Sequence, residues 1–179
     1  INKGLDIKHV VKGVVPNNAT KITEHESKPI FHSLNGLMKK SENLTAELLV
    51  KHIGLTVFDT VGSWKNGLLA IKTFLHDSVG IDTNTFSLSD GSGLSRYNYT
   101  SPNHFISALS WAYNNKNIRN KFLDTFPRGG LDGTLENRLE NIDSTTTVLA
   151  KTGSLSGVSC LSGYIISKTN SPLAFSILI

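Results

Sequence analysis

The strongest constraint on the fold of this chain is the stretch V-L-A-K-T-G-S-L-S-G at residues 148–157. It begins with apolar residues, passes through Lys151, Thr152 and Gly153 and continues in small residues. This pattern predicts a strand in which one position, Gly153, has no side chain. Glycine within a strand costs stability and usually marks a bulge or the close approach of another backbone. We therefore expect another segment, such as an extended peptide, to lie against this strand. Taken alone, the tripeptide also fits a solvated lysine at the end of a strand.

The composition predicts a single globular domain. The 179 residues are 39% hydrophobic and 18% charged, which supplies enough apolar material for a sizeable core. The longest apolar runs are too short to span a bilayer, and no signal-peptide pattern opens the chain. The formal net charge is +4, but the basic residues are scattered and their longest run is Lys39-Lys40. We expect no transmembrane segment and no nucleic-acid partner, whereas an anionic polymer would suit this charge.

The chain up to residue 140 predicts helices after a short extended region. Residues 7–15 and 19–25 are expected to form two short strands around the turn Pro16-Asn17-Asn18. Four later segments carry apolar residues at helical spacing. These predicted helices cover residues 30–40, 44–54 with a stop at Gly54, 63–80, and 101 through Ala112. A short strand at 86–88, a glycine-rich loop at 90–98 and helical pieces at 117–126 and 133–140 complete this region.

Beyond Thr145 the sequence predicts strands. Three β-rich runs cover residues 147–151, 157–167 and 172–179. The last two are separated by the turn-forming residues 168–171, which implies an antiparallel hairpin. Helices followed by an antiparallel sheet make an α+β fold.

Several familiar catalytic and metal-binding motifs are absent from the sequence. His25-Glu26 lacks the second histidine of a zinc-protease H-E-x-x-H motif, and no G-x-S-x-G nucleophile elbow occurs. The loop at Asp90 begins like a calcium loop but lacks the repeated acids and closing glutamate, so a structural turn is expected. Cys160, the single cysteine, lies in an apolar strand pattern and is predicted to be an inert core thiol. We expect no metal and no cofactor.

The tripeptide Ser41-Glu42-Asn43 has two interpretations. Serine and asparagine just before a helix commonly cap its free N–H groups. However, S-x-N followed far downstream by K-T-G on a strand gives two of the three elements of the penicillin-binding signature, whose third element is S-x-x-K. The two elements occur here in the required order.

Four longer motifs strengthen this second interpretation. They are K-K-S-E-N-L at 39–44, D-G-S-G-L-S-R at 90–96, D-G-T-L at 132–135 and A-K-T-G-S-L-S-G-V at 150–158. Through them the chain resembles, over essentially its whole length, the penicillin-binding protein 4 (DacB) type of D-alanyl-D-alanine carboxypeptidase/endopeptidases, peptidase family S13. The resemblance implies a penicillin-binding/β-lactamase-like transpeptidase fold, with helices packed on an antiparallel sheet. It also implies a periplasmic serine hydrolase that acts on peptidoglycan stem peptides and is inhibited by β-lactam antibiotics.

In such enzymes the serine of S-x-x-K attacks the D-Ala-D-Ala carbonyl, its lysine acts as the base, and water resolves the acyl-enzyme. By position, Ser41 is expected to relay a proton to the leaving D-alanine nitrogen. Asn43 is expected to hold the substrate amide and the catalytic lysine. Lys151 would set the positive potential of the cleft.

The substrate-binding residues also follow from the resemblance. Thr152 and Ser154 are expected to hold the terminal carboxylate beside Gly153, and the Ser154 N–H would form part of the oxyanion hole. In the resembled family Gly93 and Arg96 belong to a loop on the substrate side. A guanidinium at Arg96 suits the free carboxylate of a diaminopimelate-type stem peptide, although Arg96 could instead pin its own loop.

One element of the signature is missing. No lysine in the chain has a serine three residues before it, so S-x-x-K does not occur. We therefore expect residues 1–179 to be the C-terminal part of a transpeptidase-like domain that is inactive alone, with S-x-x-K and a signal peptide encoded upstream. The alternative is a non-catalytic peptidoglycan- or β-lactam-binding module that has lost its nucleophile.

Overall fold

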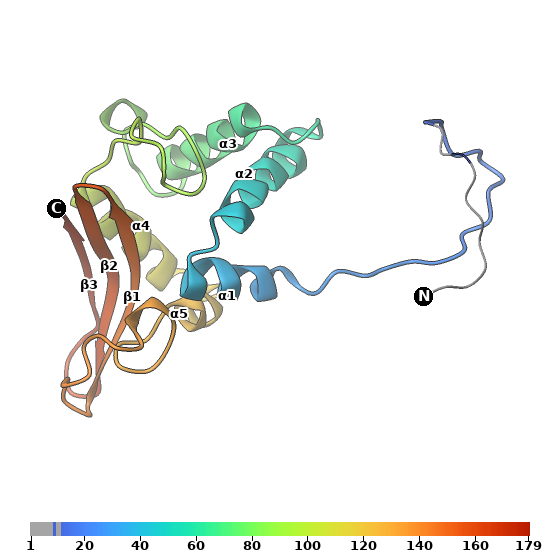
Figure 1. Cartoon of the computed structure of the whole chain (residues 1–179). Coiled ribbons are helices and arrows are strands. Elements are labelled where there is room, and N and C mark those ends of the chain that lie inside the picture. The colour runs from blue at the N-terminus through green and yellow to red at the C-terminus, as the bar shows by residue number, and fades with distance from the viewer. Residues whose placement is uncertain (1–8, 10–11) are drawn as a thin grey trace.

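The computed structural model describes residue 9 and residues 12–179 (Figure 1). Within these residues, five α-helices precede one three-stranded antiparallel sheet, so the predicted α+β class is confirmed. The elements in chain order are α1 (Ile30–Lys40), α2 (Asn43–Phe58), α3 (Trp64–Asp77), η1 (Thr83–Thr85), α4 (Pro102–Asn114), α5 (Arg119–Thr125), η2 (Gly133–Leu135), β1 (Thr146–Leu155), β2 (Val158–Ser167) and β3 (Leu173–Leu178).

The predicted strands before α1 do not appear among the residues that the structure describes there. Residues 12–29 are exposed and contain neither helix nor strand, and Figure 1 shows them leading away from the helices. Residues 7, 8, 10 and 11 of the first predicted strand lie outside the described residues. The expected turn is present, because the Ala19 N–H donates to the Pro16 carbonyl at 3.0 Å. Two short segments without a further strand to pair with are too few for a stable sheet.

Helices α2 and α3 pack closely through glycines. The sequence predicted that α2 stops at Gly54, but the helix continues to Phe58. Gly54 is buried where the two helices meet, and a Cβ atom placed on it would lie 2.6 Å from the Gly67 nitrogen of α3. A Cβ atom on Gly67 would lie 2.0 Å from the Val50 carbonyl oxygen. The prediction was wrong because this glycine provides a packing contact and does not end the helix.

Two other predicted elements are shorter than expected. The 86–88 strand is reduced to a single antiparallel bridge between Ser87 and Tyr99. The helical piece at 133–140 is only the 3₁₀ turn η2, followed by further turns. Its backbone folds back on itself, because the Gly130 N–H donates to the carbonyls of Leu135 and Arg138. The helices predicted at 30–40, 63–80 and 101–112 appear as α1, α3 and α4.

The sheet has the order β1-β2-β3 with both pairs antiparallel, so the predicted strands and their hairpin are confirmed. β1 extends beyond Lys151 to Leu155, because the residues of the K-T-G region pair fully with β2, with Gly153 opposite Cys160. Cys160 is partly buried in β2 and is not in a disulfide.

The core holds β1 from both faces. On one face Leu109, Phe126, Leu149 and Tyr164 form a cluster with α4 and α5. The Tyr164 hydroxyl donates to the Leu109 carbonyl at 2.7 Å, and burial raises the pKa of this phenol. On the other face Leu135, Val148 and Ala150 pack together. The strand is therefore anchored up to the residue that precedes Lys151.

Candidate active site

Ser41 lies in the short connection between α1 and α2. Its backbone is in the left-handed region, with φ 56° and ψ 47°, which is uncommon for a residue other than glycine. The N-cap of α2 is Glu42, and Asn43 is the first residue of that helix. All three residues are exposed. Ser41 therefore does not act as the N-cap that one interpretation of S-E-N expected.

The Lys151 side chain links β1 to the α1–α2 connection through a hydrogen bond to Ser41. Its Nζ atom donates to the Ser41 hydroxyl oxygen and, at 2.9 Å, to the Thr152 carbonyl. The two side chains are 110 positions apart in sequence. Burial lowers the pKa of Lys151. The structure thus brings S-x-N and K-T-G together, whereas no hydrogen bond among the described residues joins the Asn43 side chain to either.

The outer edge of β1 is available beyond Ala150. The Ala150 N–H donates to the Pro127 carbonyl at 3.1 Å on the side away from β2. Backbone groups alternate along an antiparallel strand, so the N–H and C=O groups of Thr152 and Ser154 face the same side. Beyond Ala150, no described segment makes backbone hydrogen bonds with this edge. An extended peptide could pair here, and the Ser154 N–H would point towards it.

The D-G-S-G-L-S-R loop is a rigid turn attached to α2. The Asp90 carboxylate accepts from the N–H groups of Gly93 and Ser95 at 2.9 and 2.6 Å. Glu47 of α2 accepts from the Ser92 N–H at 2.9 Å. Burial alone would raise the pKa of Glu47, but hydrogen bonds from Ser92, Trp64 and Gly91 lower it, so the carboxylate stays charged. Gly93 has a φ of +80°, which gives it a conformational role in this turn.

Arg96 reaches from this loop to the end of β1. Its Nη2 atom donates to the Ser156 carbonyl in the β1–β2 turn at 3.1 Å. Its partner lies 60 residues away, so this bond does not pin the loop to itself. The exposed guanidinium therefore stands beside the hairpin end that follows Ser154.

Among residue 9 and residues 12–179, no group of three or more His, Cys, Asp or Glu side chains could hold a metal ion. Within the same residues, every helix is too short or too polar to cross a membrane.

Comparison with known families identifies the chain. Residues 2–179 match the model of the D-Ala-D-Ala carboxypeptidase 3 (S13) family. The chain belongs to this family. The family predicted from the sequence motifs is therefore confirmed.

Individual relatives agree with this membership. The chain is 35% identical over 162 residues to D-alanyl-D-alanine carboxypeptidase DacB of Haemophilus influenzae, covering 89% of this chain and 33% of that protein. It is 36% identical over 165 residues to a D-alanyl-D-alanine carboxypeptidase of Actinomadura sp., covering 89% of this chain and 30% of that protein. It is 30% identical over 144 residues to penicillin-sensitive carboxypeptidase A of Dictyostelium discoideum, covering 78% of this chain and 27% of that protein. The chain thus spans about a third of the length of these relatives.

The fold agrees as well. The crystal structure of penicillin-binding protein 4 (dacB) from H. influenzae matches with a TM-score of 0.77 at 35% identity, covering 86% of this chain and 34% of that one. A second structure of that protein, complexed with a β-lactam, matches with a TM-score of 0.73. The predicted penicillin-binding fold is confirmed.

Two residues beside the candidate site, Asp132 and Thr134, were not predicted as functional. The Thr152 hydroxyl donates to the Thr134 hydroxyl at 2.9 Å, and Asp132 forms an ion pair with Lys39 at the end of α1. Asp132 and Thr134 belong to the D-G-T-L motif, to which the sequence analysis assigned no role. The motif was therefore visible in the sequence, but its contacts with α1 and K-T-G depend on the tertiary structure.

Proposed function

We propose that the protein containing this chain is a serine-type D-Ala-D-Ala carboxypeptidase/endopeptidase. Its substrates would be peptidoglycan stem peptides, and β-lactams would acylate it. The observation that carries this proposal is the contact between Lys151 and Ser41, which places a cation against a hydroxyl across 110 sequence positions. Three S13 relatives named as carboxypeptidases support it.

The site would act together with a nucleophile supplied by a preceding segment. The serine of S-x-x-K would give its proton to the lysine of that motif and attack the peptide carbonyl, forming the acyl–oxygen bond. As the carbon–nitrogen bond breaks, Ser41 would pass that proton from the lysine to the leaving nitrogen, and Asn43 would hold the substrate amide and the base. Water would then hydrolyse the acyl-enzyme and regenerate the serine. Lys151 would keep the Ser41 hydroxyl oriented and the cleft positive.

The K-T-G strand would hold the substrate. Its outer edge would pair with the extended peptide through the backbone groups of Thr152 and Ser154, on either side of Gly153, which has no side chain to obstruct the approach. Thr152 and Ser154 would bind the terminal carboxylate, and the Ser154 N–H would stabilise the oxyanion. Gly93 and Arg96 would face the substrate side chain at the end of the strand.

We further propose that residues 1–179 form the C-terminal part of the penicillin-binding domain. The chain covers about a third of each relative, and S-x-x-K does not occur in it. The whole protein would work in the periplasm, because peptidoglycan is its proposed substrate, and an upstream signal peptide would direct it there.

Intact-mass spectrometry after incubation with penicillin tests the function. The full-length protein should gain one penicilloyl adduct, and replacing the serine of its S-x-x-K with alanine should abolish the adduct. The 179-residue chain alone should gain none, because a hydroxyl without an activating base is a weak nucleophile. A full-length protein without an adduct would favour the non-catalytic binding module. An adduct on the isolated chain would identify a serine within it as the nucleophile.

A further inference from the structure

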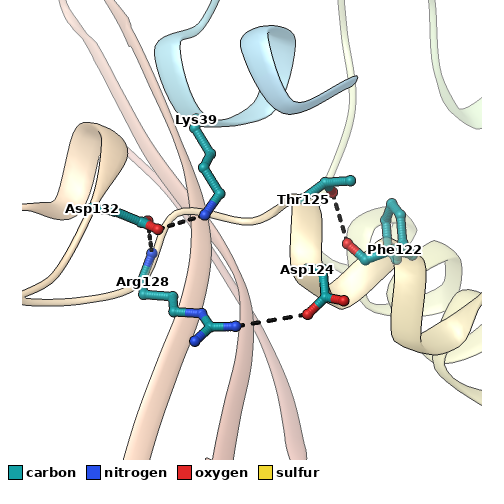
Figure 2. Close-up of polar contacts among 6 residues, drawn as sticks. All are labelled: Lys39, Phe122, Asp124, Thr125, Arg128 and Asp132. Atoms are coloured by element: carbon teal, nitrogen blue, oxygen red, sulfur yellow. Dashed lines mark hydrogen bonds and ion pairs between the residues drawn. The ribbon is translucent and has the colours of Figure 1, made fainter. Parts of the chain in front are cut away.

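Asp132 belongs to the turn segment that precedes β1 and pairs with the end of α1, with both carboxylate oxygens engaged (Figure 2). Its Oδ2 atom accepts from Lys39 Nζ at 2.5 Å, and its Oδ1 atom accepts from the Arg128 N–H at 2.8 Å. The side chains of Lys39 and Asp132 are only 27% and 33% exposed. Burial alone would raise the pKa of Asp132, but Lys39 and the Arg128 N–H lower it. The pair is therefore charged and partly shielded from water.

This ion pair fixes the last turn of α1 immediately before Ser41. Lys39 lies two residues ahead of Ser41, whose left-handed backbone is unfavourable for serine and persists only where the surroundings hold it. The backbone of Lys39 is held as well, because a Cβ atom on Gly133 would lie 2.8 Å from the Lys39 carbonyl oxygen. The side chain of Lys39 thus pairs with Asp132 and its carbonyl packs closely against Gly133, so both contact the D-G-T-L turn.

The same turn is attached to the strand that carries Lys151. The Gly129 N–H donates to the Val148 carbonyl at 2.9 Å, and the Pro127 carbonyl accepts from the Ala150 N–H at 3.1 Å. One short segment, residues 127–134, therefore contacts the end of α1 on one side and β1 on the other. The separation between the Ser41 hydroxyl and Lys151 depends on this segment.

We infer that Asp132 is a positioning residue of the site: through its ion pair with Lys39 it holds Ser41 at Lys151. This inference rests on the proposed function, in which Ser41 transfers the proton to the leaving nitrogen. Asp132 itself would touch neither the substrate nor the reacting atoms. Small displacements of such groups cost up to about a hundredfold in rate.

The test uses full-length protein and labelled penicillin, and measures both the acylation rate and the final stoichiometry. Asp132→Asn and Lys39→Met should each slow acylation about 10- to 100-fold while the stoichiometry stays at one. The double variant should be no slower than the slower single variant, because both changes remove the same pair.

Asp124→Asn is the matched control. Asp124 also pairs with Arg128, at 3.7 Å, but its side chain is 74% exposed (Figure 2), so its removal should leave the rate unchanged. A normal rate in Asp132→Asn would overturn the inference. So would a normal rate in Lys39→Met alone, because Asp132 would then act through Arg128. A reduced stoichiometry at an unchanged rate would show that Asp132 serves only the fold.

Crystal structures of the wild-type and Asp132→Asn proteins give a readout that does not depend on activity. Ser41 should leave the left-handed region or lose its hydrogen bond to Lys151. An unchanged contact would overturn the inference even if the rate falls. If the wild-type protein forms no penicilloyl adduct, the proposed function fails, and this structural comparison alone decides the role of Asp132.

Discussion

Replacing Lys151 with alanine tests the centre of the site. The change removes the positive charge and both hydrogen bonds that Nζ donates, to the Ser41 hydroxyl and the Thr152 carbonyl. The backbone of β1 should survive, because alanine retains Cβ and the pairing with β2 uses main-chain groups. Thr152 can exchange the lost bond for water, since its carbonyl faces the open edge of β1. The expected loss therefore comes from Ser41 and from the charge.

The magnitude follows from the contact that is lost. A hydrogen bond from a charged donor contributes about 1.5–3 kcal/mol. Because about 1.4 kcal/mol corresponds to a factor of ten in rate, acylation should slow about 10- to 150-fold. Loss of one important electrostatic contact in an active site gives a similar figure, of roughly a hundredfold or more.

The assay is the second-order rate of acylation of the full-length protein by labelled penicillin, with the final stoichiometry as a measure of folded protein. Lys168→Ala is the control, because that lysine is exposed in the β2–β3 turn. A Lys151→Ala rate within about threefold of wild type, at full stoichiometry, would refute the assigned role because so small a change is under about 1 kcal/mol.

The pH dependence of the rate has a defined sign. Burial lowers the pKa of Lys151 below the ordinary value of 10.5, so the ammonium loses its proton at a lower pH than a surface lysine. If the charged form is required, acylation should decline as pH rises through this lowered pKa. The decline should be absent from Lys151→Ala, and a profile that persists in the variant would assign it to another group.

Three further predictions concern the loops and the helix packing. Arg96→Ala should reduce turnover of diaminopimelate-type peptides about tenfold or more while penicillin acylation stays nearly intact, and equal losses would make Arg96 structural. Because the folded-state pKa of Asp132 is lowered from 3.8, its charged form stabilises the fold above that value, and this contribution is lost as pH falls from there through the lowered pKa. Urea unfolding from about pH 5 to 2 should therefore show a shallower pH dependence in Asp132→Asn. Gly67→Ala should destabilise the protein by about 1–3 kcal/mol in thermal unfolding because its Cβ would meet a carbonyl of α2, whereas Gly13→Ala, which has open space, should be neutral.

The sequence predicted correctly the helices that are determined by residues close together in the chain, such as capping residues and a regular apolar spacing. Apolar spacing predicted α1, and a serine followed by a proline predicted the start of α4. Glycine was misread at Gly54, because the same residue ends one helix and permits close packing of another. The helix predicted at 133–140 was wrong because backbone bonds to Gly130 close that segment into turns.

The site could be predicted only in part. Nothing in a spacing of 110 residues shows that Ser41 contacts Lys151. The resemblance to the family implied only that both residues belong to one cleft. The roles of Asp132 and Thr134 were out of reach, because their partners lie in α1 and β1 and are set by the tertiary fold. Sequence patterns report which face of an element is buried, but not which distant polar groups come to share a hydrogen bond.

Under the role proposed for Ser41, its left-handed backbone sets the stability of the fold against the activity of the site. Glycine adopts this conformation freely, whereas a residue with a Cβ atom pays about 1–3 kcal/mol for it. A screen for thermostability alone would therefore enrich Ser41→Gly and lose the hydroxyl that Lys151 contacts. Engineering of this protein for higher thermal stability should therefore leave Ser41 unchanged. S13 sequences with glycine at this position are expected among members that have lost catalytic activity.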